Sequence, residues 1–145
     1  MTSSESAVTP PLPIWWEECE TREVVVTIDF PPKELMPNRA NGKHWAASYK
    51  HKTAYRDAAY WKTTMVARAF ETTPDIAGME VHYVMPDKRW RDTDNLLAAT
   101  KAGIDGVAKA LNIDDKIINP LVVFRHTDPE QPRVVIKLIF GWRKK

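Results

Sequence analysis

A chain of 145 residues with 43% hydrophobic residues can bury the core of one domain without the support of disulfides or a structural metal. Its single cysteine excludes an internal disulfide, and its formal net charge of +2 is too small to identify a polyanionic partner. No apolar run approaches the length of a membrane span and no export signal is recognisable, so we expect a cytoplasmic protein.

Residues 1–22 are expected to form an N-terminal arm outside the domain, which spans residues 23–145. Ser, Thr and Pro dominate residues 1–13 and offer little that could pack. Trp15 and Trp16 are different, because two adjacent tryptophans are costly to leave in water. We expect them to dock the arm onto the domain or onto a partner subunit rather than to stack on bases.

Hydrophobic periodicity predicts four strands and two helices in the domain. Alternating apolar and polar residues predict the strands, and apolar residues at helical spacing predict the helices. In chain order these are strand 23–30, helix 48–70, strand 79–85, helix 95–111, strand 117–125 and strand 133–140. Turn-forming residues between the last two strands predict a hairpin. The order predicts a single-domain α+β fold, a small mixed sheet of about four strands with both helices on one face.

Basic residues gather in the loop before the first helix and along that helix. The loop over residues 31–45 has no apolar periodicity, and long basic loops often contact ligands. Its basic residues are Lys33, Arg39 and Lys43. The helix mixes Lys and Arg, including Arg56, with apolar residues, which is more typical of a solvated face than of a DNA-contacting stripe.

An acidic pair, Asp92 and Asp94, precedes the second helix and follows a basic loop that contains Lys88, Arg89 and Arg91. In an extended segment, residues two apart project to the same side, so both carboxylates are expected to face one hard cation. Asp94 is also well suited to the N-cap of the helix.

A second acidic pair, Asp114 and Asp115, follows the same helix. If the next strand returns alongside the strand before the helix, one of these two residues comes back beside Asp94. At about 100° per residue, Lys101 and Asp105 lie on the same stripe of the helix as Asp94. Carboxylates gathered next to cations indicate a metal site that faces a phosphate.

The acidic residues also allow a purely structural interpretation. The first pair would complement the helix dipole, the second pair would form a polar turn, and Lys101 would pair with Asp105. Because acidic helix starts and turns are common, the pattern by itself leaves both interpretations open. The histidines lack ligand spacing and are each expected to be structural, namely His44, His51, His82 and His126.

The stretch M-P-D-K-R-W-R-D-T-D-N, followed by a helix and an Asp-Asp pair, resembles the RusA family of Holliday junction resolvases. These are small homodimeric, magnesium-dependent endonucleases typical of phages and prophages. The resemblance rests on ordered spacing and covers residues 24–139, including Pro31-Pro32, Asn38-Arg39 and Tyr55-Arg56. It implies a RusA-like nuclease domain over residues 23–145, located in the cytoplasm of a bacterial host cell.

The resemblance implies a set of site residues that bind Mg²⁺, with Mn²⁺ as the alternative. The family's metal-binding and catalytic aspartates fall on Asp92, Asp94 and Asp115, with Asp114 the less favoured third ligand. The family has a lysine where this chain has Ala98, and we expect Lys101, one turn further along, to take over its catalytic role. The residues expected to bind DNA are Lys88, Arg89, Arg91, Arg39, Lys43 and Arg56.

The function implied by the resemblance is Mg²⁺-dependent hydrolysis of DNA at Holliday junctions by paired nicks, in recombination and repair. A homodimer would present one site to each of the two strands that are cut. Two alternatives stay open. One is a broader nuclease that acts on flaps or forks, and the other is a non-catalytic DNA-binding accessory protein of recombination in which the acidic cluster is structural.

Overall fold

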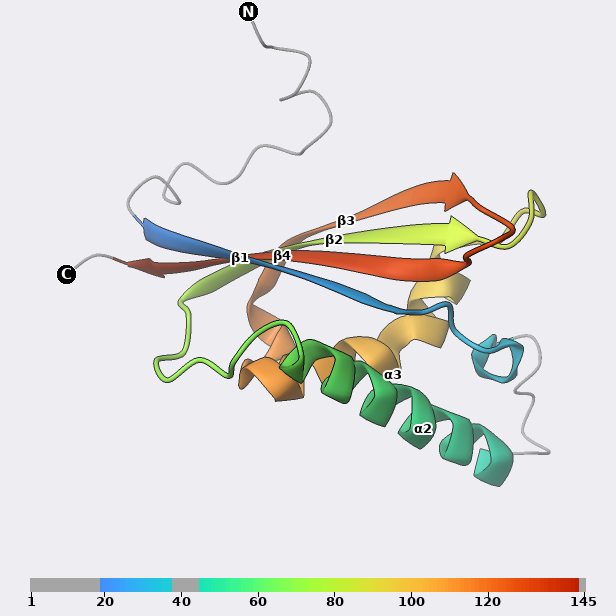
Figure 1. The fold of residues 1–145 in the computed structure, drawn as a ribbon, viewed down its shortest axis with the longest axis horizontal. Helices are drawn as coiled ribbons and strands as arrows, with labels where there is room; N and C mark the ends of the chain where they lie inside the picture. The colour runs from blue at the N-terminus through green and yellow to red at the C-terminus, as the bar shows by residue number, and fades with distance from the viewer. Residues whose placement is uncertain (1–18, 38–44, 144–145) are drawn as a thin grey trace, which may run out of the picture.

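The computed structural model describes residues 19–37 and 45–143, with the backbone alone at residues 45–47. In chain order its elements are β1 (Cys19–Asp29), η2 (Lys33–Leu35), α2 (Trp45–Thr64), β2 (Ile76–Met85), α3 (Thr93–Leu111), η3 (Asp115–Ile117), β3 (Ile118–Thr127) and β4 (Arg133–Arg143). Both main helices lie on the same face of the sheet (Figure 1). The predicted small α+β fold with a four-stranded mixed sheet is therefore confirmed.

The strands are arranged in the order β1-β4-β2-β3. β4 is antiparallel to both of its neighbours, whereas β2 and β3 are parallel. The predicted hairpin between the last two strands is wrong, because β4 pairs with β1 and β2 instead of β3. The connection from β3 passes round the end of β2 before β4 begins (Figure 1). Burial explains this choice: alternate residues of β4 from Val134 to Phe140 are at most 1% exposed, so the more apolar strand takes the central place.

Two of the predicted boundaries differ from the structure by four residues or more. β1 begins at Cys19, so the expected border after residue 22 falls inside a strand. α2 ends at Thr64 rather than at residue 70. The chain beyond it turns back so that the backbone N–H of Phe70 donates to the carbonyl of Leu111 (3.0 Å) and the Phe70 side chain enters the core. Residues 1–18, with the tryptophan pair, lie outside the described residues.

Two buried tyrosines fasten the helices to the sheet. The hydroxyl of Tyr83 in β2 donates to Thr100 Oγ1 of α3 at 2.9 Å, and burial raises the pKa of Tyr83 to about 12. The hydroxyl of Tyr55 in α2 donates to the carbonyl of Asp29 at the end of β1 (2.6 Å). Because buried polar groups are costly to leave unpaired, these bonds fix the position of each helix along the sheet. Within the described part of the chain, no helix is both long and apolar enough to cross a membrane.

The two helices approach most closely at two glycines of α3. A Cβ atom added at Gly106 would collide with the backbone carbonyl oxygen of Arg56 in α2. A Cβ atom added at Gly103 would lie 2.7 Å from a ring carbon of Tyr55 and 3.0 Å from Ile28 Cδ1. Backbone blocks the first position and side chains block the second.

Replacing Gly106 with alanine is expected to destabilise the protein by about 1 to 3 kcal/mol, because α2 must move to admit the new methyl group. Gly103→Ala is the matched control and should cost less. The side chains that obstruct a Cβ atom at position 103 can shift. The higher helix propensity of alanine then offsets about 1 kcal/mol of the remaining steric cost. Urea unfolding of both variants checks this order, and an equal or larger loss for Gly103→Ala would contradict it.

Candidate functional site

The first acidic pair, Asp92 and Asp94, lies at the start of α3, after the loop that follows β2. Asp92 is the N-cap residue, in an extended conformation, and Asp94 is already in the first turn of the helix. The prediction of Asp94 as N-cap is therefore wrong by two residues. The carboxylate of Asp92 makes no capping hydrogen bond to the helix. Instead, its Oδ1 accepts a hydrogen bond from Trp90 Nε1 at 3.1 Å. Both aspartates are exposed, next to the positive end of the helix dipole.

The two residues of the second acidic pair, Asp114 and Asp115, have different partners. Asp114 caps η3, since its Oδ1 accepts from the backbone N–H of Lys116 at 2.9 Å. Asp115 instead points to α3, where its Oδ2 lies 3.4 Å from Lys101 Nζ. Lys101 also lies 3.4 Å from Asp105 Oδ1, so one ammonium group bridges two carboxylates.

Asp115 does not return beside Asp94, and the strand register gives the reason. β3 starts with Ile118 opposite Ala77, at the beginning of β2, whereas α3 starts beyond Met85 at the other end of that strand. At about 3.3 Å per residue the two ends are about 26 Å apart. The crossover helix spans this length, so Asp115 meets the middle of α3 and not its start.

The Lys101 cluster is a surface feature. Partial burial opposes the charged form of Lys101, but the nearby carboxylates of Asp105 and Asp115 outweigh it and hold the pKa above its ordinary value. The lysine side chain is 66% exposed. Exposed ion pairs contribute at most about 1 kcal/mol each. The cluster is therefore free to rearrange without loss of the fold.

The three predicted metal ligands do not form one group in this arrangement. Across residues 19–37 and 48–143, no set of three or more His, Cys, Asp or Glu side chains is close enough to hold a metal ion. Asp92, Asp94 and Asp115 carry the oxygen donors that Mg²⁺ prefers, yet the third faces Lys101 at a different point of the helix. The carboxylates as they lie therefore do not fit a three-ligand metal site.

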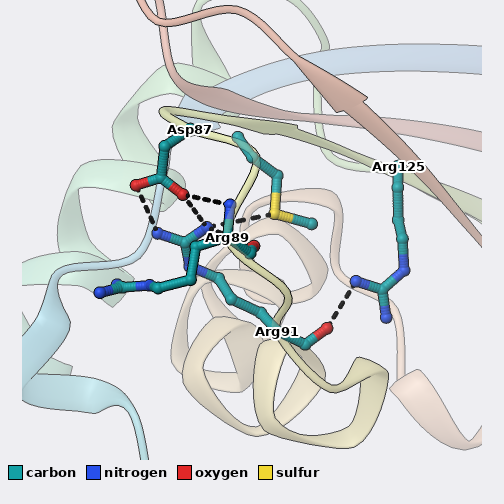
Figure 2. Close-up of polar contacts among 5 residues, drawn as sticks. Asp87, Arg89, Arg91 and Arg125 are labelled. Atoms are coloured by element: carbon teal, nitrogen blue, oxygen red, sulfur yellow. Dashed lines mark hydrogen bonds and ion pairs between the residues drawn. The ribbon is translucent and has the colours of Figure 1, made fainter.

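The basic loop before α3 is held by Arg91. Its guanidinium makes a bidentate pair with Asp87, at 2.9 and 3.2 Å, and Asp87 also accepts from the backbone N–H of Arg89 at 2.9 Å (Figure 2). The Arg91 side chain is 11% exposed and lies over the ring of Phe30, 5.8 Å from its centre. Arg91, predicted to bind phosphate, is thus committed to organising the loop.

Arg125 is a site residue that the sequence prediction missed. Its Nη1 and Nη2 donate at 2.5 Å to the carbonyl of Arg91 and to Thr93 Oγ1, which ties β3 to the start of α3 (Figure 2 shows the first bond). Its guanidinium also lies 4.4 Å from the centre of the Trp90 ring. A signal was present: in the alternation of β3, Arg125 follows Val123 on the side that faces the core.

The other predicted DNA-binding residues are dispersed. Lys88 and Arg89 are exposed. The Lys88 side chain has no polar partner within the described residues, whereas the charge of Arg89 acts on Asp87 and helps to lower its pKa. Arg56 is half-buried in α2, where its carbonyl packs against Gly106. The predicted contacts Arg39 and Lys43 lie outside the described residues.

A cleft opens beside the basic loop and the first acidic pair. Its volume is about 530 Å³, and it lies between the loop that follows β1 and the loop that precedes α3. Apolar walls are formed by residues such as Phe30 and Met36, and the cationic side chains of Lys33 and Arg89 also line it. Asp92 is part of the same lining. One predicted aspartate is therefore adjacent to an apolar cleft that carries positive charge.

Two histidines that are 44 residues apart in the sequence, His82 and His126, meet on the face of the sheet away from the helices. His82 Nδ1 and His126 Nε2 are 2.9 Å apart, and His82 Nε2 is 3.0 Å from Glu80 Oε1. The rings lie within 14° of one plane, with centres 5.2 Å apart, so the two nitrogens face each other in a hydrogen bond and do not converge on a metal. The wrong hairpin prediction concealed this pair, because β3 lies beside β2.

A comparison of the chain with protein-family models and with curated proteins finds no match. The resemblance to Holliday junction resolvases thus rests on the motif and its spacing.

Acid should weaken the clamp on the basic loop. The bond from Arg91 is the main cause that holds the pKa of Asp87 below its ordinary value of 3.8. Because the folded-state pKa is depressed, the pair stabilises the protein above pH 3.8 and this contribution is lost as pH falls through the folded-state value. Asp87→Asn should therefore reduce stability near neutral pH and have a shrinking effect in acid. Urea unfolding as a function of pH checks this, and a pH-independent difference would contradict it.

Proposed function

We propose that this chain is a structure-selective endonuclease that resolves four-way DNA junctions by paired nicks, in recombination and repair, as the RusA family does. The observation that carries the proposal is the exposed carboxylate of Asp92 in the lining of a cleft that also has cationic side chains. The exposed carboxylate of Asp94 follows two residues later, in the first turn of α3. Carboxylates next to cations are the arrangement that metal-assisted hydrolysis of a phosphodiester requires. The ordered motif described above supports the same assignment.

The proposal includes Mg²⁺, with Mn²⁺ as the alternative, and takes Asp92, Asp94 and Asp115 as its ligands. When bound, the metal would supply Lewis-acid chemistry and an activated water. One chain does not bring the three carboxylates together, so Asp92 and Asp94 support this part most directly. Asp115 would join them after a rearrangement of the exposed Lys101 cluster or from a second copy of the chain.

The basic residues have distinct proposed roles. Lys88 and Arg89 are exposed, so they suit contacts with phosphates whose strength depends on salt. Arg91 and Arg125 fix the loop that presents them. Lys101 would neutralise charge that develops on the cleaved phosphate, in place of the family lysine at the Ala98 position. We propose a homodimer, because a two-fold axis matches two opposed nicks, and a location in the cytoplasm of a bacterial host cell.

A second candidate function is favoured by one observation. Because the described residues form no three-carboxylate group, the chain could act in recombination as a DNA-binding accessory protein without cleaving DNA. In that case the aspartates at the start of α3 would serve the helix dipole alone. Cleavage assays separate the two functions.

Replacing Asp92 or Asp94 with asparagine should lower the rate of junction cleavage by about 100-fold or more, because a charged ligand to the metal is lost. Binding to the junction should survive, since a negative charge near phosphate is removed. The measurement is nicking of a four-way junction with Mg²⁺, compared with flaps, forks and linear duplex. Asp115→Asn in the same assay tests the third ligand.

Asp57→Asn is the control for these substitutions, because Asp57 is an exposed aspartate of α2 that is not one of the proposed metal ligands. It should cut at the wild-type rate. A wild-type protein that binds junctions but cuts no branched DNA with Mg²⁺ or Mn²⁺ would favour the accessory function. Faster cleavage of flaps than of four-way junctions would favour the broader nuclease.

Lys101→Ala should slow cleavage by about 100-fold if this lysine stabilises charge at the reacting phosphate. Stability should change little, because Lys101 is exposed. Introducing Ala98→Lys into the Lys101→Ala variant should restore part of the rate, since Ala98 is exposed one turn earlier on the same stripe. Lys109→Ala, in the last turn of α3, is the control. Cleavage by Lys101→Ala at the wild-type rate would exclude the role.

A further inference from the structure

Trp90 is exposed but is held in place. It exposes 74% of its surface, yet its indole Nε1 donates to Asp92 Oδ1 at 3.1 Å and the Arg125 guanidinium lies 4.4 Å from its ring centre. Arg125 is itself fixed by two hydrogen bonds to Arg91 and Thr93. An aromatic ring that is already oriented loses little conformational entropy when a ligand binds to it.

Among the described residues, Arg125 covers one face of the Trp90 ring. A guanidinium can cover one face of an indole, and the high exposure of the residue means that the opposite face is accessible. A flat π system stacks well on such a face, and every nucleobase has one. The ring is therefore suited to a planar aromatic ligand more than to a flexible aliphatic one.

The cleft that Trp90 lines has the size and chemistry for a nucleotide. Its volume is about 530 Å³, and apolar side chains such as Phe30, Met36 and Pro86 form its walls. Lys33 and Arg89 add positive charge, and the Lys33 side chain has no ion-pair partner within the described residues. Apolar walls beside exposed cations are complementary to a base that is attached to a phosphate.

The geometry of stacking determines which bases of DNA the Trp90 ring can contact. In a continuous duplex both faces of each base are covered by neighbouring bases, so a protein ring can stack only where a base is unpaired or terminal. Such bases occur at branch points, flaps and strand ends. A stacking tryptophan would therefore distinguish branched DNA from linear duplex without reading its sequence.

We propose that Trp90 is a stacking platform for an unpaired base of DNA, and that the cleft beside it receives the strand opened at a branch point. This inference rests on the proposed action on branched DNA and adds the feature by which the site selects it. Asp92 and Arg125 act as positioning residues for the ring, and the cations of the cleft hold the adjacent phosphate.

The test compares Trp90→Ala with Trp90→Phe in binding without a divalent metal. Both variants lose the hydrogen bond to Asp92, but only the phenylalanine keeps a ring. The probes are a fluorescently labelled oligo-dT strand, a four-way junction and a blunt duplex, measured by anisotropy. We expect Trp90→Ala to weaken binding of the single strand and the junction by about 10-fold, with little change for duplex, and Trp90→Phe to stay near wild type.

Trp61→Ala is the matched control, because Trp61 lies on α2 and is 64% exposed. Equal affinities of Trp90→Ala and Trp90→Phe for the single strand, or an equal loss on duplex, would overturn the inference. If the wild-type protein cuts junctions and Trp90→Ala binds the single strand as tightly as wild type, only the stacking role is contradicted. If the wild-type protein cuts no DNA but Trp90→Ala binds the single strand more weakly than Trp90→Phe, only the proposed cleavage is contradicted.

Discussion

The parallel pairing of β2 with β3 is the constraint on which the candidate site depends. Parallel strands need a crossover, and α3 supplies it. The end of β3 therefore lies at the start of α3, which brings Arg125 to the basic loop. The beginning of β3 lies at the other end of the sheet, which carries Asp115 to the middle of α3. The register of β2 and β3 thus explains why Arg125 meets the basic loop and why Asp115 does not meet the aspartates at the start of α3.

The loop before α3 uses its charges in two ways. Arg91 is neutralised by Asp87 and buried against Phe30, so its charge serves the conformation of the loop. Arg125 bonds to the loop backbone and covers one face of Trp90. With these two arginines committed to structure, the positive charge available to a ligand comes from exposed neighbours. Counting basic residues in a sequence therefore overestimates the charge that a loop offers to DNA.

Sequence patterning predicted the four strands and the two main helices, because apolar residues recur at strand or helical spacing along the chain. It could not predict the strand order, because alternation in β3 and β4 is compatible with a hairpin as well as with insertion of β4. The position of Asp92 and Asp94 at the start of α3 could be predicted from their motif. The position of Asp115, the role of Arg125 and the contact of His82 with His126 all depend on strand order, which local patterns do not encode.

Asp92 links the two proposed properties of the site. One of its oxygens accepts the Trp90 indole N–H. A carboxylate has two oxygens and about four acceptor positions, so the second oxygen stays free for a cation while the first orients the ring. Cation binding and base stacking at this point need not compete, because they use different oxygens of one group. The exposed carboxylate and the exposed tryptophan are then two parts of one arrangement at the start of α3.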